Sequence, residues 1–228
     1  MSSLDLSGVW IPIVTPFRAG RVDHGALAAL VKRLAADGVA GVVVCATTGE
    51  APLLTDIERV EVLGTIRAAT TLPLVMGASG TTADEVLRRT DAAMAHAPDA
   101  FMVTPPPYLR PSQDALRAFF TTIADGLPAP LVLYDIPART GVRIELDTLL
   151  ALAAHPRIVA LKDCGGRVEQ TEALIADGRL RQLTRAEDVA LEKRAASSAE
   201  RTRRDPAVLA DLLLSPIGGL SAVSRLRP

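Results

Sequence analysis

"RIVALKDCGG", residues 157–166, is a run of apolar residues that ends on a lysine, an aspartate and, after a cysteine, two glycines. Branched apolar residues favour a buried β-strand, and the glycines indicate a turn directly after it. Lys162 therefore stands where a strand stops and a loop begins. Only three lysines occur in the chain beside 22 arginines, so a lysine at this point suggests a role that arginine does not fill.

Similar apolar runs recur through the first part of the chain. They cover residues 8–15, 41–46, 73–78, 100–104 and 131–135. Segments of helical period lie between them, at residues 23–37, 55–69, 82–96, 112–126 and 145–154. The expected helix starts are Asp23, Thr55, Thr82, Ser112 and Glu145. Strand starts recur about every thirty residues, which is the length of one βα unit.

Strict alternation of strands and helices predicts a parallel sheet, and strands that are apolar throughout are covered on both faces. An open doubly wound sheet and a closed barrel both fit this pattern. The open sheet is typically marked by a glycine fingerprint, but the nearest stretch, GASG at 77–80, lacks the GxGxxG spacing and the lysine of a P-loop. We therefore predict an α/β fold of the (β/α)₈ TIM-barrel class.

Composition narrows the function. A length of 228 residues with 49% hydrophobic residues fits one domain with a full core. A net charge of −1 and 3% aromatic residues disfavour nucleic-acid binding. No apolar stretch reaches the ~18 residues that span a membrane, and the N-terminus lacks the positive region of a secretion signal. We expect a cytoplasmic protein that acts on a small molecule, with Cys45 and Cys164 as small buried residues.

Polar residues gather where the predicted strands end, and in a barrel the loops at these positions build the active site. A lysine amine in a desolvated pocket has a pKa that falls from ~10.4 toward neutrality, so it attacks a ketone, whereas arginine stays protonated. Lys162 therefore predicts a Schiff base. The candidate site residues are Thr47, Thr48, Gly49, Tyr108, Tyr134, Arg139 and Lys162.

The other candidates fit the steps that a Schiff base requires. Forming an imine and then an enamine needs protons to be moved, and a buried tyrosine hydroxyl linked to a threonine hydroxyl can pass them, which suits Tyr134 and Thr47. A 2-oxo acid also brings a carboxylate, which Thr48 and the backbone of Gly49 can hold. Arg139 fits a second carboxylate.

Four motifs, in this order and spacing, carry a family resemblance. TTGE at 47–50, TPPPYLRPS at 104–112, YDIPARTG at 134–141 and ALKD at 160–163 resemble the dihydrodipicolinate synthase/N-acetylneuraminate lyase family, and the likeness covers about residues 8–184. The resemblance implies a (β/α)₈ barrel, commonly a homotetramer of paired dimers. It also implies a class I aldolase or related lyase or dehydratase that forms a lysine imine with pyruvate or another 2-oxo acid and needs no cofactor.

The resemblance gives roles to five residues. It makes Lys162 the Schiff-base lysine and Tyr134 the acid/base phenol. Thr47 and Tyr108 become its proton relay, with Tyr108 reaching into the site of a neighbouring subunit. Thr48 holds the pyruvate carboxylate. We accordingly expect a homo-oligomer whose partners are a 2-oxo acid and an aldehyde.

Arg139 points to the second substrate. In dihydrodipicolinate synthases, an arginine two residues after the proline of the Y-x-x-P stretch receives the carboxylate of aspartate semialdehyde. Arg139 occupies that place, so the expected reaction condenses pyruvate with aspartate semialdehyde, in diaminopimelate and lysine biosynthesis. Another 2-oxo-acid aldolase or dehydratase of the family, and an inactive remnant that only binds 2-oxo acids, are the alternatives.

Plainer interpretations exist for the same residues. Lys162 fits an ordinary strand-end lysine, the two threonines fit a turn, and Arg139 fits an ion pair with Asp135. The three histidines fall near predicted helix ends without metal-ligand spacing, so we predict no metal site.

The C-terminal part departs from the family pattern. LRQLT at 180–184 is the candidate for strand seven, but residues 187–205 are dense in charge, serine and alanine. The glycine-rich eighth strand and the later helical segment of the family have no clear counterpart. We therefore expect a barrel portion with strands one to seven over 1–184 and a divergent, mainly helical segment over 185–228. Such a barrel is incomplete or atypical at strands 7 and 8.

Overall fold

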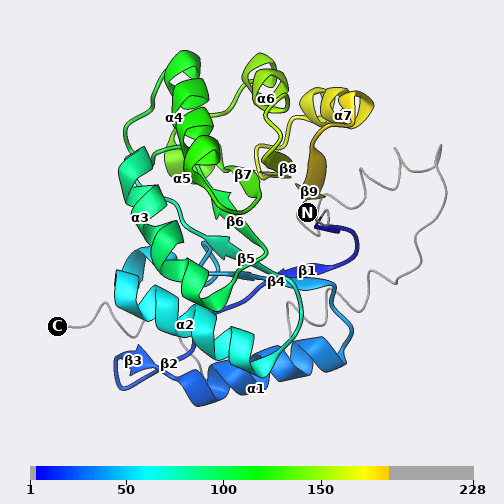
Figure 1. Cartoon of the computed structure of the whole chain (residues 1–228). Helices are drawn as coiled ribbons and strands as arrows, with labels where there is room; N and C mark the ends of the chain where they lie inside the picture. Colours follow the sequence, from blue (N-terminus) through cyan, green and yellow to red (C-terminus); the bar gives the residue numbers. More distant parts are fainter. Residues whose placement is uncertain (1–3, 185–228) are drawn as a thin grey trace.

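The computed structural model of this chain describes residues 4–184 (Figure 1). Seven strands in this part form one sheet in which every neighbouring pair is parallel. They are β1 (Trp10–Pro12), β4 (Gly41–Val44), β5 (Leu74–Gly77), β6 (Ala100–Val103), β7 (Leu131–Asp135), β8 (Ile158–Asp163) and β9 (Arg181–Thr184). A separate short hairpin pairs β2 (Phe17–Arg18) with β3 (Arg21–Val22).

Helices lie between successive strands of the sheet and follow its outer side in chain order (Figure 1). They are α1 (His24–Ala36), α2 (Asp56–Ala69), α3 (Ala83–Ala93), α4 (Gln113–Gly126), α5 (Pro137–Thr140), α6 (Leu146–Leu152) and α7 (Val168–Asp177), with short 3₁₀ turns η1 (Ala51–Leu53) and η2 (Met94–His96). Four of the expected helix starts are confirmed as N-caps whose side chains accept a backbone N–H: Asp23, Thr55, Thr82 and Ser112.

Strand order separates the two architectures that the sequence left open. The strands run β1-β4-β5-β6-β7-β8-β9, which is their order along the chain. A doubly wound sheet reverses its strand order at a switch point. No reversal occurs within residues 4–184, so the described sheet is singly wound, as in a barrel.

Two apolar layers lie on the two faces of the sheet, because side chains alternate along each strand. On one face, residues such as Phe101 and Leu133 pack with helix residues in a large core. On the other face, Val43, Met102 and Val132 pack with further strand residues in a second core that contains no helix residue among the described ones. Strand side chains, with a few from adjoining loops such as Leu6 and Ala46, fill this inner face, as in the interior of a barrel.

The elements match the predicted ranges with a few differences. The strand expected over 8–15 is shorter, because only 10–12 pair with β4. The strand expected over 180–184 is confirmed as β9, which pairs with β8. Helices α5 and α7 and the hairpin β2–β3 were not predicted. The divergent segment expected over 185–228, with its weak eighth strand, lies outside the described residues.

Candidate active site

Lys162 and Tyr134 stand side by side at the carboxyl ends of β8 and β7. The register of these parallel strands places Tyr134 directly opposite Lys162. The Nζ atom of Lys162 lies 4.6 Å from the centroid of the Tyr134 ring, a distance at which an ammonium is attracted to an aromatic face. Lys162 is half-buried, whereas Tyr134 is buried. The predicted nucleophile and the predicted phenol therefore form a contacting pair.

An irregularity in β8 produces this pairing. Leu131 pairs with Ile158, but the next residue of β7, Val132, pairs with Ala160. Val159 is thus one extra residue on β8, as in a β-bulge. If Val159 instead paired with Val132 in a regular register, Lys162 would stand opposite Asp135, with its side chain on the other face of the sheet.

Thr47 joins the pair from across the sheet. Its Oγ1 atom lies 3.5 Å from the hydroxyl oxygen of Tyr134 in a hydrogen bond that either group can donate. Thr47 follows β4, and two strands separate β4 from β7. In a flat sheet these strands would lie about 14 Å apart. The contact therefore shows that the sheet curls until the ends of β4 and β7 face each other, which is the curvature of a barrel.

The environment of Tyr134 keeps its proton in place. Burial raises the pKa of this phenol above its ordinary value, while the hydrogen bond from Thr47 lowers the pKa. The side chain of Cys164 also interacts with Tyr134 and contributes to the rise, whereas the charge of Arg139 opposes it. A protonated phenol linked to a threonine hydroxyl is suited to donating and recovering a proton.

The loop that carries Thr47 and Thr48 has an unusual backbone. Cys45 and Glu50 adopt left-handed conformations, with φ of 51° and 53°. The Thr15 hydroxyl donates to the carbonyl of Gly49 at 2.7 Å, which ties the turn to the segment after β1. Thr48 is exposed and Gly49 is buried. The turn therefore presents the Thr48 side chain to solvent beside the Thr47–Tyr134 contact.

A buried arginine holds the far side of the same loop. Arg59 of α2 is 7% exposed, and it donates to the carbonyl of Ala51 at 2.5 Å and of Leu54 at 3.4 Å. Asp56 lies between Arg59 and Arg89, with its Oδ1 atom 3.7 Å and 2.8 Å from their Nε atoms.

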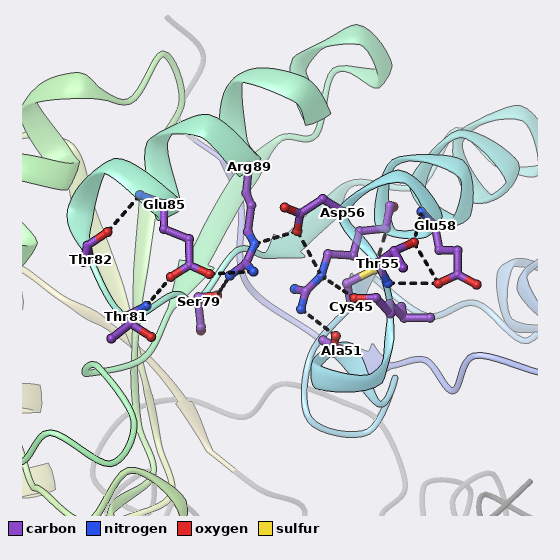
Figure 2. Close-up of polar contacts among 12 residues, drawn as sticks. Cys45, Ala51, Thr55, Asp56, Glu58, Ser79, Thr81, Thr82, Glu85 and Arg89 are labelled. Atoms are coloured by element: carbon purple, nitrogen blue, oxygen red, sulfur yellow. Dashed lines mark hydrogen bonds and ion pairs between the residues drawn. The ribbon is translucent and has the colours of Figure 1, made fainter. Parts of the chain in front are cut away.

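The same network reaches the loop after β5, as Figure 2 shows. Arg89 of α3 donates to the carbonyl of Ser79 at 2.6 Å and pairs with Glu85 at 2.7 Å. Glu85 accepts the N–H of Thr81 at 2.7 Å. The loops that follow β4 and β5 are therefore fixed to side chains of α2 and α3.

Two further predicted site residues are exposed, whereas Tyr134 is buried. Tyr108, in the loop after β6, is 92% exposed and has a φ of 73°. Arg139 is exposed in the short helix α5. Within this single chain, the described structure does not bring Tyr108 into contact with Tyr134.

Sequence reasoning missed an acidic group behind the pair. Asp135 and Asp163 are buried and follow Tyr134 and Lys162 on the neighbouring strands. The alternative ion pair between Arg139 and Asp135 is wrong, because Asp135 faces Arg143, whose Nη1 lies 3.7 Å from its Oδ2. The alternation of the strands would have placed both acids on the face opposite the site.

The two cysteines differ from each other. Cys45 is buried as expected, and burial raises its pKa to about 12. Cys164 is only half-buried and interacts with Tyr134, so the expectation that both are buried is wrong for Cys164. Neither cysteine is in a disulfide.

Residues 4–184 contain neither a cluster of metal ligands nor a membrane-spanning helix. No three His, Cys, Asp or Glu side chains come together there as a group that could hold a metal ion. None of the helices in this part is both long and apolar enough to cross a membrane.

The family model and the individual relatives that match this chain point to the same family. The model of the dihydrodipicolinate synthetase family matches residues 5–184. A 4-hydroxy-tetrahydrodipicolinate synthase from Streptomyces coelicolor is 41% identical over 167 residues, which cover 72% of this chain and 55% of that protein. One from Sorangium cellulosum is 38% identical over 180 residues, covering 77% of this chain and 60% of that protein.

Solved structures agree with the sequence matches. The chloride-inhibited dihydrodipicolinate synthase from Acinetobacter baumannii, complexed with pyruvate, superposes with a TM-score of 0.78 at 32% identity, covering 82% of this chain and 66% of that one. The chain thus spans between about half and two thirds of the length of these relatives.

Proposed function

Because the chain belongs to the dihydrodipicolinate synthetase family, we propose that it is a lyase that condenses pyruvate with an aldehyde through an imine on Lys162. The observation that supports this most is the contact of Lys162 with Tyr134, which in turn hydrogen-bonds Thr47. A lysine amine, a protonated phenol and a hydroxyl lie together at the carboxyl ends of the strands. These are the nucleophile and the proton donors and acceptors that forming an imine requires.

The steps follow from these three groups. The Lys162 amine attacks the carbonyl carbon of pyruvate, and the carbinolamine loses water to give the imine. Tyr134 supplies the proton that the departing hydroxyl requires. Loss of a proton from the methyl group of pyruvate then gives an enamine, whose carbon forms the new bond to the aldehyde carbonyl. Thr47 keeps the Tyr134 hydroxyl oriented and passes protons to and from it.

The turn after β4 is the proposed site for the pyruvate carboxylate. Thr48 presents an exposed hydroxyl beside the Tyr134–Thr47 contact, and the buried Gly49 contributes backbone. Hydroxyl and backbone N–H donors in such a turn suit an anion.

Arg139 is the proposed site for a second carboxylate, which makes aspartate semialdehyde the favoured aldehyde. It follows β7 in α5, close enough to Tyr134 for its charge to lower the pKa of that phenol. A guanidinium in this position matches a carboxylate in two hydrogen bonds. Another aldehyde that lacks the carboxylate would gain nothing from Arg139.

Tyr108 and the barrel complete the proposal. The exposed side chain of Tyr108 is proposed to enter the site of a second copy of the chain and extend the proton relay there. The seven described strands are proposed to belong to a (β/α)₈ barrel. The lysine imine is the only activation of pyruvate that the proposed reaction requires, so we propose no metal or cofactor.

One labelling experiment tests the imine directly. The protein is incubated with pyruvate and cyanoborohydride, and tryptic peptides are analysed by mass spectrometry. We expect the mass of one pyruvate, less water and plus two hydrogens, on the peptide that contains Lys162. Lys162→Arg should abolish the adduct, and Lys32→Arg, at an exposed site on α1, should leave it unchanged. A folded wild type without adduct would overturn the imine mechanism.

A further inference from the structure

Two buried aspartates lie directly behind the Lys162–Tyr134 pair. Asp135 and Asp163 are opposite each other in the register of β7 and β8, and they are 0% and 4% exposed. Because side chains alternate along a strand, both point to the helix-covered face, away from the reacting groups. They can therefore act on the site only by holding the backbone that carries it.

Two hydrogen bonds that Asp135 accepts join the end of β7 to two other segments. Its Oδ1 atom accepts the N–H of Ile144 at 3.2 Å. Its main-chain oxygen accepts the N–H of Cys164 at 2.8 Å, which continues the pairing of β7 with β8 beyond Lys162. Asp163 fixes the same loop from its own side, because its Oδ1 atom accepts the N–H of Gly165 at 2.6 Å.

Arg143 connects the two acids through Gly165. Its Nη2 atom donates to the Gly165 carbonyl at 2.9 Å, and its Nη1 atom lies 3.7 Å from Asp135 Oδ2. A Cβ atom on Gly165 would lie 2.9 Å from Asp135 Oδ2 and 3.0 Å from Asp163 Oδ1, and it would overlap Arg143. The three charged groups therefore converge on one point of the loop after β8.

The charges of this cluster do not balance. Asp135 faces Asp163 on β8. Arg143 and Glu145, on the segment before α6, also act on Asp135. Glu145 is itself paired with Arg167 at 2.8 Å. Burial raises the pKa of Asp135 to about 7; the charges of Asp163 and Glu145 add to the rise, and Arg143 opposes it. Asp135 therefore exchanges a proton near neutral pH.

We propose that Asp135, Arg143 and Asp163 form a positioning cluster that holds Lys162 against Tyr134 and makes imine formation depend on the charge of Asp135. This inference rests on the imine chemistry proposed above. When Asp135 is ionised, Arg143 is attracted to β7 while it binds the Gly165 carbonyl, so the two strand ends are held together. When Asp135 is protonated, that attraction is lost.

The test measures the rate of pyruvate adduct formation on Lys162, with cyanoborohydride, from about pH 5 to about pH 9. We expect the wild-type rate to rise about tenfold with pH, in a limb of the pH–rate profile whose midpoint lies near pH 7. Small displacements of a reacting group have effects of this size or more. Asp135→Asn should lack the limb and stay at the low rate. Asp91→Asn, at an exposed site on α3, is the matched control and should behave as wild type.

Two further variants predict different outcomes, which a purely structural role would not produce. Asp163→Asn removes a charge that raises the pKa of Asp135, so the limb should move to lower pH. Arg143→Met removes the cation through which the charge of Asp135 acts, so the limb should disappear and the rate should stay low. A limb that persists in Asp135→Asn would come from another group and would overturn the positioning role.

Equilibrium unfolding separates this inference from the proposed function. The folded-state pKa of Asp135 lies above its ordinary 3.8, so the folded state binds more protons and stability falls as pH rises from about 4 to about 7. The urea midpoint of Asp135→Asn, relative to wild type, should therefore increase across this range. No adduct in the wild type would overturn the imine and the positioning role with it. An adduct with identical pH profiles in wild type and Asp135→Asn would overturn the positioning role alone.

Discussion

Thr47 and Tyr134 share a hydrogen bond of 3.5 Å although 87 positions separate them in the chain. They follow strands that are not neighbours, and the curl of the sheet brings them together. The bond also makes Tyr134 the central member of the site, because its ring contacts Lys162 and its hydroxyl contacts Thr47. Substitutions of Lys162 or Thr47 should therefore alter the environment of the Tyr134 side chain.

Thr47→Val removes the hydroxyl at nearly constant shape. The hydrogen bond from Thr47 lowers the pKa of Tyr134, so its loss should raise that pKa further and misorient the phenol. We expect the rate of adduct formation to fall by about tenfold to a hundredfold. Thr48→Val is the matched variant, and it should raise the pyruvate concentration needed for half-maximal rate with little change in the limiting rate. Identical kinetic effects of the two substitutions would contradict their separate roles.

Tyr134→Phe keeps the ring against Lys162 and deletes only the acid/base group. Loss of a general acid or base typically costs about 10²-fold to 10⁴-fold in rate, and we expect adduct formation to slow within this range. The thermal midpoint should change little, because the buried ring remains. Wild-type kinetics in a folded Tyr134→Phe protein would remove Tyr134 from the mechanism.

Arg139→Leu should separate the two substrates. The pyruvate adduct on Lys162 should form at the wild-type rate, whereas kcat/KM for aspartate semialdehyde should fall about tenfold to a hundredfold, since a charged hydrogen bond contributes about 1.5–3 kcal/mol. Arg33→Leu, in the last turn of α1, is the control for loss of one surface arginine. If kcat/KM for the aldehyde is unchanged in Arg139→Leu, Arg139 does not bind it.

Alkylation should distinguish the two cysteines. Burial raises the pKa of Cys45 to about 12, and the thiolate is the reactive form, so iodoacetamide near pH 8 should leave Cys45 unmodified until the protein is denatured. Cys164 is half-buried and should react in the native state. Prior formation of the pyruvate adduct should slow this reaction, because Cys164 interacts with Tyr134. Peptide mapping would show which cysteine is alkylated first. Preferential labelling of Cys45 in the native protein would contradict its burial.

Gly77→Ala and Gly25→Ala should have opposite effects on stability. A Cβ atom at Gly77 would overlap the carbonyl of Cys45, so we expect a loss of about 1–3 kcal/mol in the free energy of unfolding. At Gly25, in the first turn of α1, the nearest atom to an added Cβ is 3.5 Å away. Alanine there should gain about 0.5 kcal/mol through helix propensity. Urea unfolding of both variants checks the signs.

Much of the fold could be predicted because local pattern and tertiary packing agree. Thr55 accepts the backbone N–H of Glu58 in a capping box, and that motif is readable in the sequence. Strands β4, β5 and β6 are apolar throughout because both of their faces are covered. The hairpin β2–β3 has only two residues in each strand, which is too short to leave a periodic pattern.

The site could be predicted only in part. Residue type and position at strand ends identified Lys162 and Tyr134 as candidates, but the contact between Tyr134 and Thr47 depends on sheet curvature, which no local pattern encodes. Arg143 was missed for a similar reason: it lies eight residues after Asp135 in an irregular segment, and its ion pair with Asp135 exists only once the loop folds back.

The extra residue at Val159 has a consequence for comparing sequences. If Val159 paired regularly with Val132, all four motifs would stay legible, but every later residue of β8 would move by one position against β7 and Lys162 would share the helix-covered face of Asp135. Among homologous chains, the presence of this bulge in β8 is therefore as informative about function as the lysine itself. A homologue with the same motif and strand length but a regular β8 would carry its amine away from Tyr134 and Thr47.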